Sequence, residues 1–581
     1  MLETKMTTLG MLCRTARFFE RSHQRSHERI LDRILARLER IAVVPNETPI
    51  QGATVATKTF LRALISHAKL DKYLLFAAPN HVEPIKKAIQ AGRNSWAVGD
   101  RVKVASFLDL VRWFDTYKIN GWLDLEFNFE APSLLRRRLS SRLFPITVTH
   151  HSISYQRLLR NDFIPMVLAE SYPFDSIVCT SRSARTAIET ILDRTSTEVN
   201  RELRVDARFR GRLEVIPFGI DTDRFRPRPK ELARSQLGLA RELFIILYHG
   251  RLSPVDKADL IPLMRVYREL VTSNPKLSLL LVIAGGQAGH YRDSLACYVR
   301  ESHLNRHVKF IVKPEDPAVI YSAADLFVSP VDNIQESFGL TVVEAMACGL
   351  PQVVSDWDGY RDTVIDGQTG FLIPTYWMRC DSDICEAAPL FGPSAIHDHA
   401  ALAQSVAVDL RVYRERLQQL ITNHDLRVEM GRRSRERAVS VFAWEIVMRQ
   451  YQRLWAEMEA TAATSNRSPR SYASSVHPHY YEAFGHNASH EISLATPLRI
   501  TDAGTRPGSI LMQPYQLAYN LKLLDQQLLE VILRAVRLKE TNISEIAMTL
   551  HGLTEYSTYH SDFVYRHVMW LMKYGLIEIV P

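Results

Sequence analysis

Residues 325–356 read DLFVSPVDNIQESFGLTVVEAMACGLPQVVSD and predict a strand, a helix and a second strand in succession. The apolar run DLFVSPV has the length of a buried strand, and PQVVS is a second such run. Between them, LTVVEAMA has a helical composition and is followed by Gly349, because glycine favours the left-handed backbone found just after a helix. This succession is typical of a parallel β-α-β unit.

The same alternation of short apolar runs and helical stretches continues on both sides of this unit. We expect two Rossmann-like, doubly wound α/β domains, over residues 41–225 and 226–459, joined through IPFGIDTDRFRP at residues 216–227. Residues 374–404 break the alternation and are expected to form an insertion or a long loop. Two such domains imply a ligand-binding cleft between them, at the C-terminal ends of their strands.

Three further segments complete the expected domain order. Residues 1–40 carry apolar side chains at helical spacing opposite arginines, which predicts an amphipathic helical segment that docks on the first domain or lies on a membrane surface. Residues 460–495 are rich in Ser, Ala and Asn and are expected to be a linker. Residues 496–581 predict three helices and a short strand, in an order that resembles a winged-helix domain.

The C-terminal segment lacks the charge of a nucleic-acid-binding domain. From Leu521 to Pro581, six basic residues stand against seven acidic ones, and the helix that would enter a groove opens with Asp562. A domain without a basic footprint is a poor phosphate binder. We therefore expect a docking or regulatory module with a protein partner, and no nucleic acid.

The composition is that of an ordinary globular protein. Of 581 residues, 46% are apolar and 23% are charged, which excludes collagen-like and mainly disordered classes. The six cysteines are widely scattered, which fits reduced thiols better than a disulfide framework. Because no apolar run is long enough to span a membrane and no apolar signal-peptide core is found, we expect a cytoplasmic protein.

The net charge of +8 is unevenly distributed. Residues 1–224 hold 35 Lys and Arg against 25 Asp and Glu, and the rest of the chain is slightly acidic. Arginines cluster at positions 136, 137, 138 and 142. Such a cluster could meet phosphates or an anionic lipid leaflet, which would give peripheral membrane contact through the first half. A solvated surface is the alternative.

Two carboxylates, Glu336 and Glu344, lie on either side of the start of the predicted helix. The first turn of a helix has N–H donors without intrahelical acceptors, so it attracts anions such as a diphosphate. One carboxylate can then accept hydrogen bonds from sugar hydroxyls, and the other from a ribose diol. An ordinary capped helix is the alternative. The candidate N–H donors belong to Ser337, Phe338, Gly339, Leu340 and Thr341.

Two cations, Arg251 and Lys257, follow the first predicted strand of the second domain, in HGRLSPVDKADL. Positive charges near a helix N-terminus oppose the helix dipole, and a negatively charged ligand would offset that conflict. Arg251 and Lys257 could hold a diphosphate leaving group as charge grows on it.

GRLSPVDK, ESFGLTVVE and IPFGIDTDRF together resemble the motifs of the retaining glycosyltransferases of family four (group 1), which have the GT-B fold of two Rossmann-like domains facing across a cleft. The resemblance covers roughly residues 41–457. It implies a retaining hexosyltransferase that uses a nucleotide-diphosphate sugar as donor and needs no metal or other cofactor. The acceptor would be a sugar, a lipid-linked molecule or another small molecule.

The resemblance also implies roles for the residues of the second domain. Arg251 and Lys257 would contact the diphosphate beside Gly250, and Glu336 would contact the donor sugar. The amides of residues 337–341 would bind the phosphates and the sugar, and Glu344 would bind the ribose.

In the first domain, the resemblance points to FPITVTHHSISY and to NETPIQGATVATKTF. His151 matches a histidine that the family places near the reacting sugar, with His150 as the second choice. Gly52 would lie near the donor phosphate or the acceptor. The segment DWDGYRDTV departs from the family, which commonly has two glycines and a glutamate there; Gly359 is kept and Asp362 takes the acidic place.

Two other functions remain open from the sequence. A nucleotide-sugar 2-epimerase could use the same scaffold, and a catalytically inactive scaffold protein could bind a sugar nucleotide and act through its C-terminal segment. An epimerase would convert its donor without any acceptor, whereas an inactive protein would bind the donor and form no product.

Overall fold

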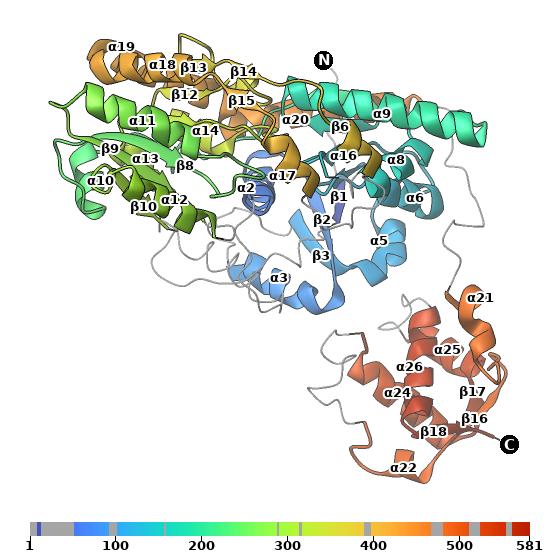
Figure 1. Cartoon of the computed structure of the whole chain (residues 1–581). Coiled ribbons are helices and arrows are strands. Elements are labelled where there is room, and N and C mark those ends of the chain that lie inside the picture. Colours follow the sequence, from blue (N-terminus) through green and yellow to red (C-terminus); the bar gives the residue numbers. More distant parts are fainter. Residues whose placement is uncertain are drawn as a thin grey trace.

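The computed structural model of the chain describes residues 8–12, 52–91, 101–155, 159–286, 290–312, 316–387, 397–465, 480–510, 523–553 and 561–580. Within these ranges the chain forms a seven-stranded and a six-stranded sheet, a two-stranded ribbon and a three-stranded sheet. Figure 1 shows the two large sheets, each flanked by helices, and a smaller C-terminal unit.

The first domain is a parallel sheet in the order β3-β2-β1-β4-β5-β6-β7. Its strands are β1 (Thr8–Leu12), β2 (Lys72–Ala77), β3 (Val102–Ser106), β4 (Gly121–Asp124), β5 (Ile146–Thr149), β6 (Ser176–Cys179) and β7 (Arg212–Val215). Its main helices are α2 (Gly52–His67), α3 (Pro79–Ala91), α5 (Leu110–Thr116), α6 (Glu130–Leu139), α8 (Ile164–Leu168) and α9 (Arg182–Leu203).

The expected boundary at residue 41 is wrong, because β1 lies in the middle of the first sheet. Residues Thr8–Leu12 pair with β2 on one side and with β4 on the other. The first domain therefore includes part of the segment that was expected to be separate. A five-residue strand has little periodicity of its own, and its partners are more than fifty residues away, so its pairing is decided by tertiary contacts. The helix predicted within residues 1–40 lies outside the described residues.

The second domain repeats the design in the order β10-β9-β8-β11-β12-β13, again fully parallel. Its strands are β8 (Phe244–His249), β9 (Leu279–Ala284), β10 (Val308–Ile311), β11 (Leu326–Ser329), β12 (Gln352–Ser355) and β13 (Gly370–Ile373). Its helices are α10 (Lys230–Gln236), α11 (Ile261–Ser273), α12 (Tyr291–Glu301), α13 (Pro317–Ala323), α14 (Leu340–Ala347), α15 (Tyr360–Thr363), α18 (Leu410–Thr422) and α19 (His424–Arg437).

Both sheets have the doubly wound strand order, in which the chain starts in the middle, builds one side and then crosses to the other. This order confirms the expected GT-B class of two Rossmann-like domains. In such sheets a ligand crevice opens beyond the carboxyl ends of the two strands where the direction reverses. Those strands are β1 and β4 in the first sheet, and β8 and β11 in the second.

The chain passes between the domains twice, and the two crossings lie against each other. The backbone amide of Ile220 donates to the carbonyl of Phe442 at 2.7 Å, and the amide of Trp444 donates back to Ile220 at 3.3 Å. After the second crossing, α20 (Trp444–Ala463) packs on the first domain, where Phe60 contacts the rings of Trp444 and Tyr451. The second domain therefore ends before α20, although its sequence pattern continues to residue 459.

The insertion at residues 374–404 contains regular structure. A ribbon pairs β14 (Thr375–Tyr376) with β15 (Ala407–Val408), and two short helices lie between them, α16 (Ser382–Ala387) and α17 (His397–Ala403). In Figure 1, α16 and α17 lie where the two domains meet.

The C-terminal unit has its own apolar core and an antiparallel sheet in the order β17-β16-β18. Asn542 caps α25 by accepting a hydrogen bond from the amide of Glu545 at 2.9 Å. Parts of the expected linker over residues 460–495 are helical, since α20 ends at Ala463 and α21 spans Tyr480–Phe484. The elements of the unit are β16 (Pro497–Ile500), α22 (Asp502–Thr505), α24 (Gln526–Leu538), β17 (Thr541–Asn542), α25 (Ile543–His551), α26 (Ser561–Lys573) and β18 (Ile577–Ile579).

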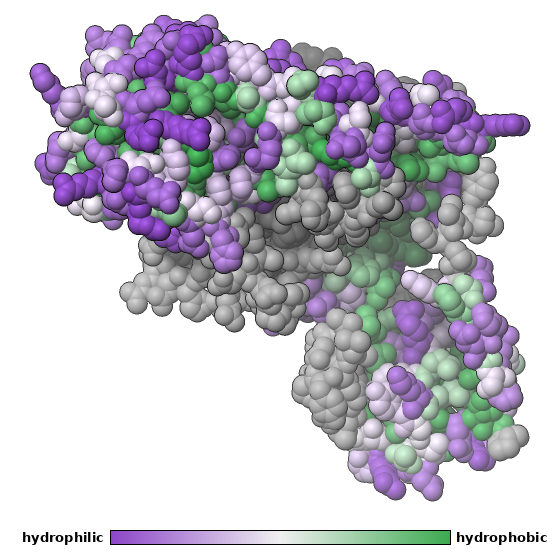
Figure 2. Space-filling view, viewed as in Figure 1, coloured by the Kyte–Doolittle hydropathy of each residue, from purple (hydrophilic) through white to green (hydrophobic). Residues whose placement is uncertain are grey.

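Among the described helices, none combines the length and the apolar content that crossing a bilayer requires. Figure 2 shows that, on the face in view, hydrophilic residues cover much of the two large domains and apolar residues are scattered between them.

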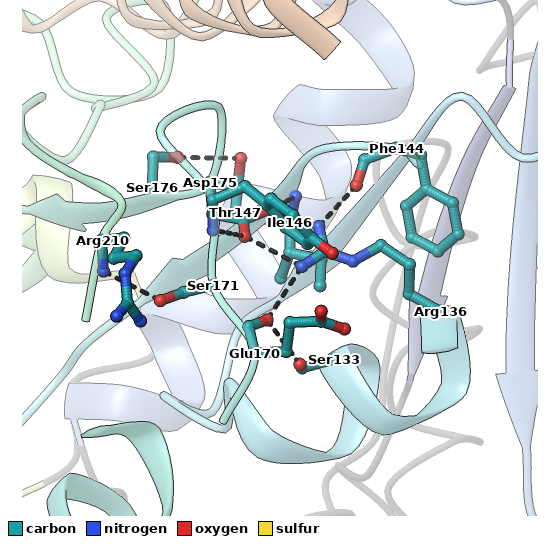
Figure 3. A network of polar contacts seen from close by, with 11 residues as sticks. Ser133, Arg136, Phe144, Ile146, Thr147, Glu170, Ser171, Asp175, Ser176 and Arg210 are labelled. Carbon is teal, nitrogen blue, oxygen red and sulfur yellow. Dashed lines mark hydrogen bonds and ion pairs between the residues drawn. The ribbon is translucent and has the colours of Figure 1, made fainter. Parts of the chain in front are cut away.

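The expected basic surface around residue 136 is partly wrong. Arg136 is 1% exposed, and its guanidinium donates to both carboxylate oxygens of Asp175, at 2.7 and 2.9 Å. It also donates to the carbonyls of Phe144 and Glu170 (Figure 3). A side chain so enclosed cannot reach a lipid leaflet. The sequence shows a run of arginines but not which one turns inward to meet a buried aspartate.

This buried pair gives a stability prediction. Asp175→Asn leaves the Arg136 charge buried and uncompensated, so the free energy of unfolding should fall by about 3–5 kcal/mol. The measurement is urea unfolding followed by circular dichroism. Arg138→Ala removes an exposed charge from the same helix and should change the value by less than about 0.5 kcal/mol. Equal losses of unfolding free energy in the two variants would contradict the burial of the Arg136–Asp175 ion pair.

Candidate functional site

The site lies at the reversal point of the second sheet. Gly250, Arg251 and Lys257 follow β8, and Glu336 follows β11, which is the neighbouring strand. The two loops therefore leave the same edge of the sheet side by side. Of these four sequence-predicted residues, the structure brings Lys257 and Glu336 into direct contact.

The loop after β8 is held close to the sheet. The amide of Gly250 donates to the carbonyl of Ala284 at 3.0 Å, and that of Leu252 donates to Gly286 at 2.8 Å. Gly285 has a φ of 140°, and a Cβ there would lie 1.8 Å from the carbonyl oxygen of Gly250. This close approach of two backbones requires a glycine and fixes where the Arg251 segment begins.

Both predicted cations are paired with carboxylates of the protein. The Lys257 ammonium contacts Oε2 of Glu336 in a short ion pair, and Arg251 pairs with Asp256 at 2.9 Å. Beneath them, burial raises the pKa of Tyr248, and the nearby charges of Glu336 and Asp332 raise it further. The crevice thus contains both signs of charge close together, in a setting where water is partly excluded.

Three buried polar atoms of this crevice have no hydrogen-bond partner among the described residues: Nε of Arg251, Oδ1 of Asp256 and Oδ1 of Asn333. Buried polar groups are normally paired. These atoms are therefore candidates for contact with a polar ligand.

The start of α14 is shaped by Gly339. Its φ is 89°, and a Cβ there would lie 2.3 Å from the ring of Tyr360. Both the positive φ and the lack of room for a Cβ favour glycine. The amides of Val342 and Val343 already bond to the carbonyl of Gly339. The preceding amides, of Leu340 and Thr341, come before the first intrahelical acceptor, as the first N–H groups of any helix do.

The other predicted members of this segment differ in their surroundings. The Phe338 ring is buried in the core of the second domain. The Ser337 hydroxyl donates to the carbonyl of His151 at 3.0 Å, which ties the segment to the first domain.

Glu344 lies at the end of a chain of polar contacts. The Tyr321 hydroxyl donates to the Glu344 carboxylate at 2.6 Å, and Nδ1 of His249 lies 2.7 Å from the same hydroxyl. Burial raises the pKa of Glu344 from 4.5 to about 7, although the hydrogen bond from Tyr321 lowers it in part. Burial also lowers the pKa of His249 to about 4. The carboxylate is thus held in one orientation by a neutral tyrosine and a neutral imidazole.

The two histidines after β5 have different environments. His150 is fully buried, and its Nε2 accepts a hydrogen bond from the amide of Thr180 at 3.2 Å. His151 lies against the Glu336 segment: its carbonyl binds Ser337, its Nε2 is 3.2 Å from the Thr57 hydroxyl, and its ring stacks on Phe218. Burial lowers the pKa of His151 to about 4, so its imidazole is neutral near pH 7.

Gly52 is the first residue of α2, the helix that follows β1 along the chain. Residues 13–51, between β1 and Gly52, lie outside the described residues. Thr57 of the same helix contacts His151, which places α2 beside the histidine end of the site.

Several residues that position the site carried no signal in the sequence. Oε1 of Gln335 accepts hydrogen bonds from the Ser152 hydroxyl and from the amides of Ile153 and Ser154. The Thr180 hydroxyl donates to the carbonyl of Ser337 at 3.0 Å. These contacts hold the Glu336 segment against the first domain. A single Gln or Thr in a loop has no periodicity or spacing that could reveal them.

The DWDGYRDTV segment clamps the backbone of Glu336. The Asp358 carboxylate accepts from the amide of Glu336 at 2.8 Å, and the amide of Gly359 donates to the carbonyl of Glu336 at 3.1 Å. A Cβ on Gly359 would lie 2.4 Å from the carbonyl oxygen of Ser337, which explains why a glycine is kept there. Asp362 pairs with Arg182 of the first domain.

Metal ligands are not grouped in the described part of the chain, where no three His, Cys, Asp or Glu side chains are arranged to hold an ion.

Residues 229–381 match the family model described as "Glycosyl transferases group 1". Two similar curated proteins are D-inositol 3-phosphate glycosyltransferases, from Nocardia farcinica (36% identical over 169 residues) and from Corynebacterium jeikeium (28% identical over 265 residues). The matched segments cover 28% and 44% of this chain, and only 37% and 54% of the relatives' own lengths. Among solved structures, sucrose-phosphate synthase from Thermosynechococcus elongatus is similar, with 18% identity, a TM-score of 0.47, and coverage of 78% of this chain and 100% of the other.

The buried carboxyl of Glu344 gives a pH prediction. Because its pKa is raised from 4.5 to about 7, the folded state holds this proton more tightly than the unfolded state does. The wild-type free energy of unfolding should therefore fall as the pH rises from about 4.5 to about 7. Glu344→Gln removes that loss, so the melting temperature of the variant minus that of the wild type should be more positive at pH 8 than at pH 5.

The control for this measurement is Glu415→Gln, which alters an exposed glutamate of α18. If the melting temperature of Glu344→Gln minus that of the wild type is the same at pH 5 and at pH 8, the pKa of the Glu344 carboxyl is not raised in the folded state.

Proposed function

We propose that the chain is a group 1 glycosyltransferase that moves a hexosyl group from a nucleotide-diphosphate sugar to an acceptor hydroxyl, with retention of anomeric configuration. The observation that carries the proposal is the crevice at the reversal point of the second sheet. It combines Arg251, Lys257, Glu336 and the open N-terminus of α14 within the segment that matches the group 1 family.

The pairing of Lys257 with Glu336 supports a role in binding a diphosphate. A diphosphate carries more charge than one carboxylate and offers several oxygens, so it competes with Glu336 for the ammonium and with Asp256 for Arg251. Once Lys257 turns to the phosphate, the Glu336 carboxylate can accept hydrogen bonds from the sugar. Donor binding would thus prepare the residue that orients the sugar.

Retention follows if the acceptor attacks on the face that the leaving group departs from, as the family resemblance implies. The bond from the anomeric carbon to the phosphate oxygen breaks, and a bond to the acceptor oxygen forms. The acceptor proton moves to the departing phosphate oxygen. Arg251 and Lys257 stabilise the charge that grows on the phosphate, and this preorganised stabilisation is the main catalytic contribution of the site.

His151 would act as a hydrogen-bonding group near the reacting sugar. With its pKa lowered to about 4, the imidazole is neutral and can bind a hydroxyl without adding charge. Glu344 would bind the ribose diol. Gly52, in the first domain, would let the donor phosphate or the acceptor come close to the backbone. We expect no metal, because two side-chain cations and a helix terminus supply the charge that a divalent ion would.

The acceptor belongs to the proposal only as a class: a sugar, a lipid-linked molecule or another small molecule. The two relatives are named D-inositol 3-phosphate glycosyltransferases, and inositol is a ring that bears hydroxyls, which supports an acceptor of that kind. A cytoplasmic location and contact with a membrane surface remain predictions from the sequence. The element order of the C-terminal unit supports a winged-helix-like module, for which we propose a protein partner.

The proposed roles predict the effect of two substitutions. Lys257→Ala removes a charge from the leaving group and Glu336→Gln weakens the contact with the sugar, so each should reduce turnover by around two orders of magnitude. The measurement is nucleoside diphosphate release with UDP-, GDP- and ADP-sugars, together with identification of the glycosylated product.

The matched control is Lys230→Ala, which removes an exposed ion pair with Asp325 in the same domain and should leave turnover near the wild-type value. Near-wild-type turnover of Lys257→Ala or Glu336→Gln would disprove the role assigned to that residue. Conversion of the donor to its epimer without an acceptor would identify a 2-epimerase instead.

A further inference from the structure

The insertion at residues 374–404 is anchored in the second domain at its base. There, β14 and β15 pair as an antiparallel ribbon. Nε1 of Trp377 donates to the Ser405 hydroxyl at 2.9 Å, and the Trp377 ring packs edge-on against Trp357 of the same domain, with 6.0 Å between centroids. The short helix α17, which lies between β14 and β15 in the chain, is therefore carried by the second domain.

His399 of α17 contacts the first domain, at the place where the two domains meet (Figure 1). Its ring stacks on the Tyr155 ring, with 4.2 Å between centroids and 13° between the planes. Its Nε2 lies 3.2 Å from the carbonyl oxygen of Ser154. Because a carbonyl oxygen only accepts, Nε2 carries the proton and donates this hydrogen bond. His399 is 5% exposed, so the contact between the domains is shielded from most water.

We propose that His399 is a positioning residue for the transfer reaction: it holds residues 152–155 of the first domain against the donor site of the second. The proposal rests on the proposed function and gives α17 a part in it. His399 contacts neither substrate in this role. It acts by favouring the arrangement of the domains in which His151 lies against the Glu336 segment.

Residues 152–155 are held by the second domain at two separate points. Oε1 of Gln335 accepts a hydrogen bond from the amide of Ser154 at 3.2 Å, and Nε2 of His399 lies 3.2 Å from the carbonyl oxygen of the same residue. Ser154 therefore bonds through its amide to the loop that carries Glu336 and through its carbonyl to α17. Two anchors on one peptide segment fix both its place and its direction.

The same segment borders the proposed site at both of its ends. His151 comes directly before it, and the His151 carbonyl accepts from the Ser337 hydroxyl at 3.0 Å. At the other end, burial raises the pKa of Tyr155, the charge of Asp256 raises it further, and the charge of Arg251 lowers it in part. The Tyr155 hydroxyl is thus within electrostatic reach of the Arg251–Asp256 pair. A shift of this segment would therefore disturb the site at two places.

The contact acts on domain closure more than on donor binding. Arg251, Lys257 and Glu336, which are proposed to bind the donor, all belong to the second domain and can bind it without His399. An interaction that forms only when the domains are together shifts their equilibrium toward that arrangement. Loss of a ring stack and a hydrogen bond corresponds to about a tenfold change in such an equilibrium.

Hydrogen exchange of the full chain, followed by mass spectrometry, tests the positioning without turnover. In His399→Ala, the amides of Ile153 and Ser154 should exchange about tenfold faster than in the wild type, because their bonds to Gln335 open more often. His399→Gln keeps a donor for the Ser154 carbonyl, and His399→Phe keeps the stack on Tyr155. Each of these two variants should therefore exchange at an intermediate rate.

The control is Tyr376→Phe, which removes a hydrogen bond to Asp409 at the base of the same insertion and should leave the exchange of residues 152–155 unchanged. If His399 only stabilises its own insertion, His399→Ala will speed exchange within residues 397–408 and leave residues 152–155 as in the wild type. That result would overturn the proposal, as would equal exchange of residues 152–155 in His399→Ala and Tyr376→Phe.

Steady-state kinetics connect the contact to the reaction. The donors are UDP-, GDP- and ADP-glucose, the acceptors are myo-inositol and D-inositol 3-phosphate, and the readout is nucleoside diphosphate release with identification of the product. His399→Ala should lower kcat about tenfold and change the KM for the donor by less than about threefold. His399→Gln and His399→Phe should each restore part of kcat.

An unchanged kcat in His399→Ala, or a rise in KM as large as the fall in kcat, would overturn the positioning role, because His399 would then have no effect or would act on donor binding. If the wild type turns over none of the donors, the proposed function fails for them. The exchange measurement would still decide whether His399 holds residues 152–155.

Discussion

The reversal of strand order in the second sheet is the constraint on which the site depends. Because β8 and β11 are neighbours although they are far apart in the chain, the loops that follow them leave the sheet side by side. One loop supplies Arg251 and Lys257, and the other supplies Glu336 and the start of α14. Without this adjacency, the Lys257–Glu336 contact and the buried polar atoms around it would not form.

The first domain completes the site by holding the Glu336 segment in place. Gln335 accepts three hydrogen bonds from residues 152–154, and Ser337 contacts both His151 and Thr180. The domains are linked again where the backbone of Ile220 pairs with Phe442 and Trp444. The geometry of the crevice therefore depends on the relative position of the domains, which suits the proposed transfer reaction because that reaction must exclude water.

The sequence predicted the two doubly wound domains, because buried parallel strands and amphipathic helices alternate with clear periods. It also singled out Lys257 and Glu336, which are in contact in the structure, since both follow strand ends in recognisable motifs. It failed at β1, whose five residues pair only through distant contacts, at Arg136, which looked like its exposed neighbours, and at the packing of α20 on the first domain. The left-handed backbone of Asp358, whose φ is 44°, and the contacts of Gln335 depend on tertiary structure alone.

The most direct test of the central claim is the affinity of a nucleoside diphosphate without its sugar, measured by calorimetry for the wild type and two variants. If Glu336 and the diphosphate compete for Lys257, Lys257→Ala should weaken binding by at least tenfold, whereas Glu336→Gln should bind as tightly as the wild type or more tightly. Equal weakening by both substitutions would contradict the competition, and unchanged binding in Lys257→Ala would show that the diphosphate does not bind in this crevice.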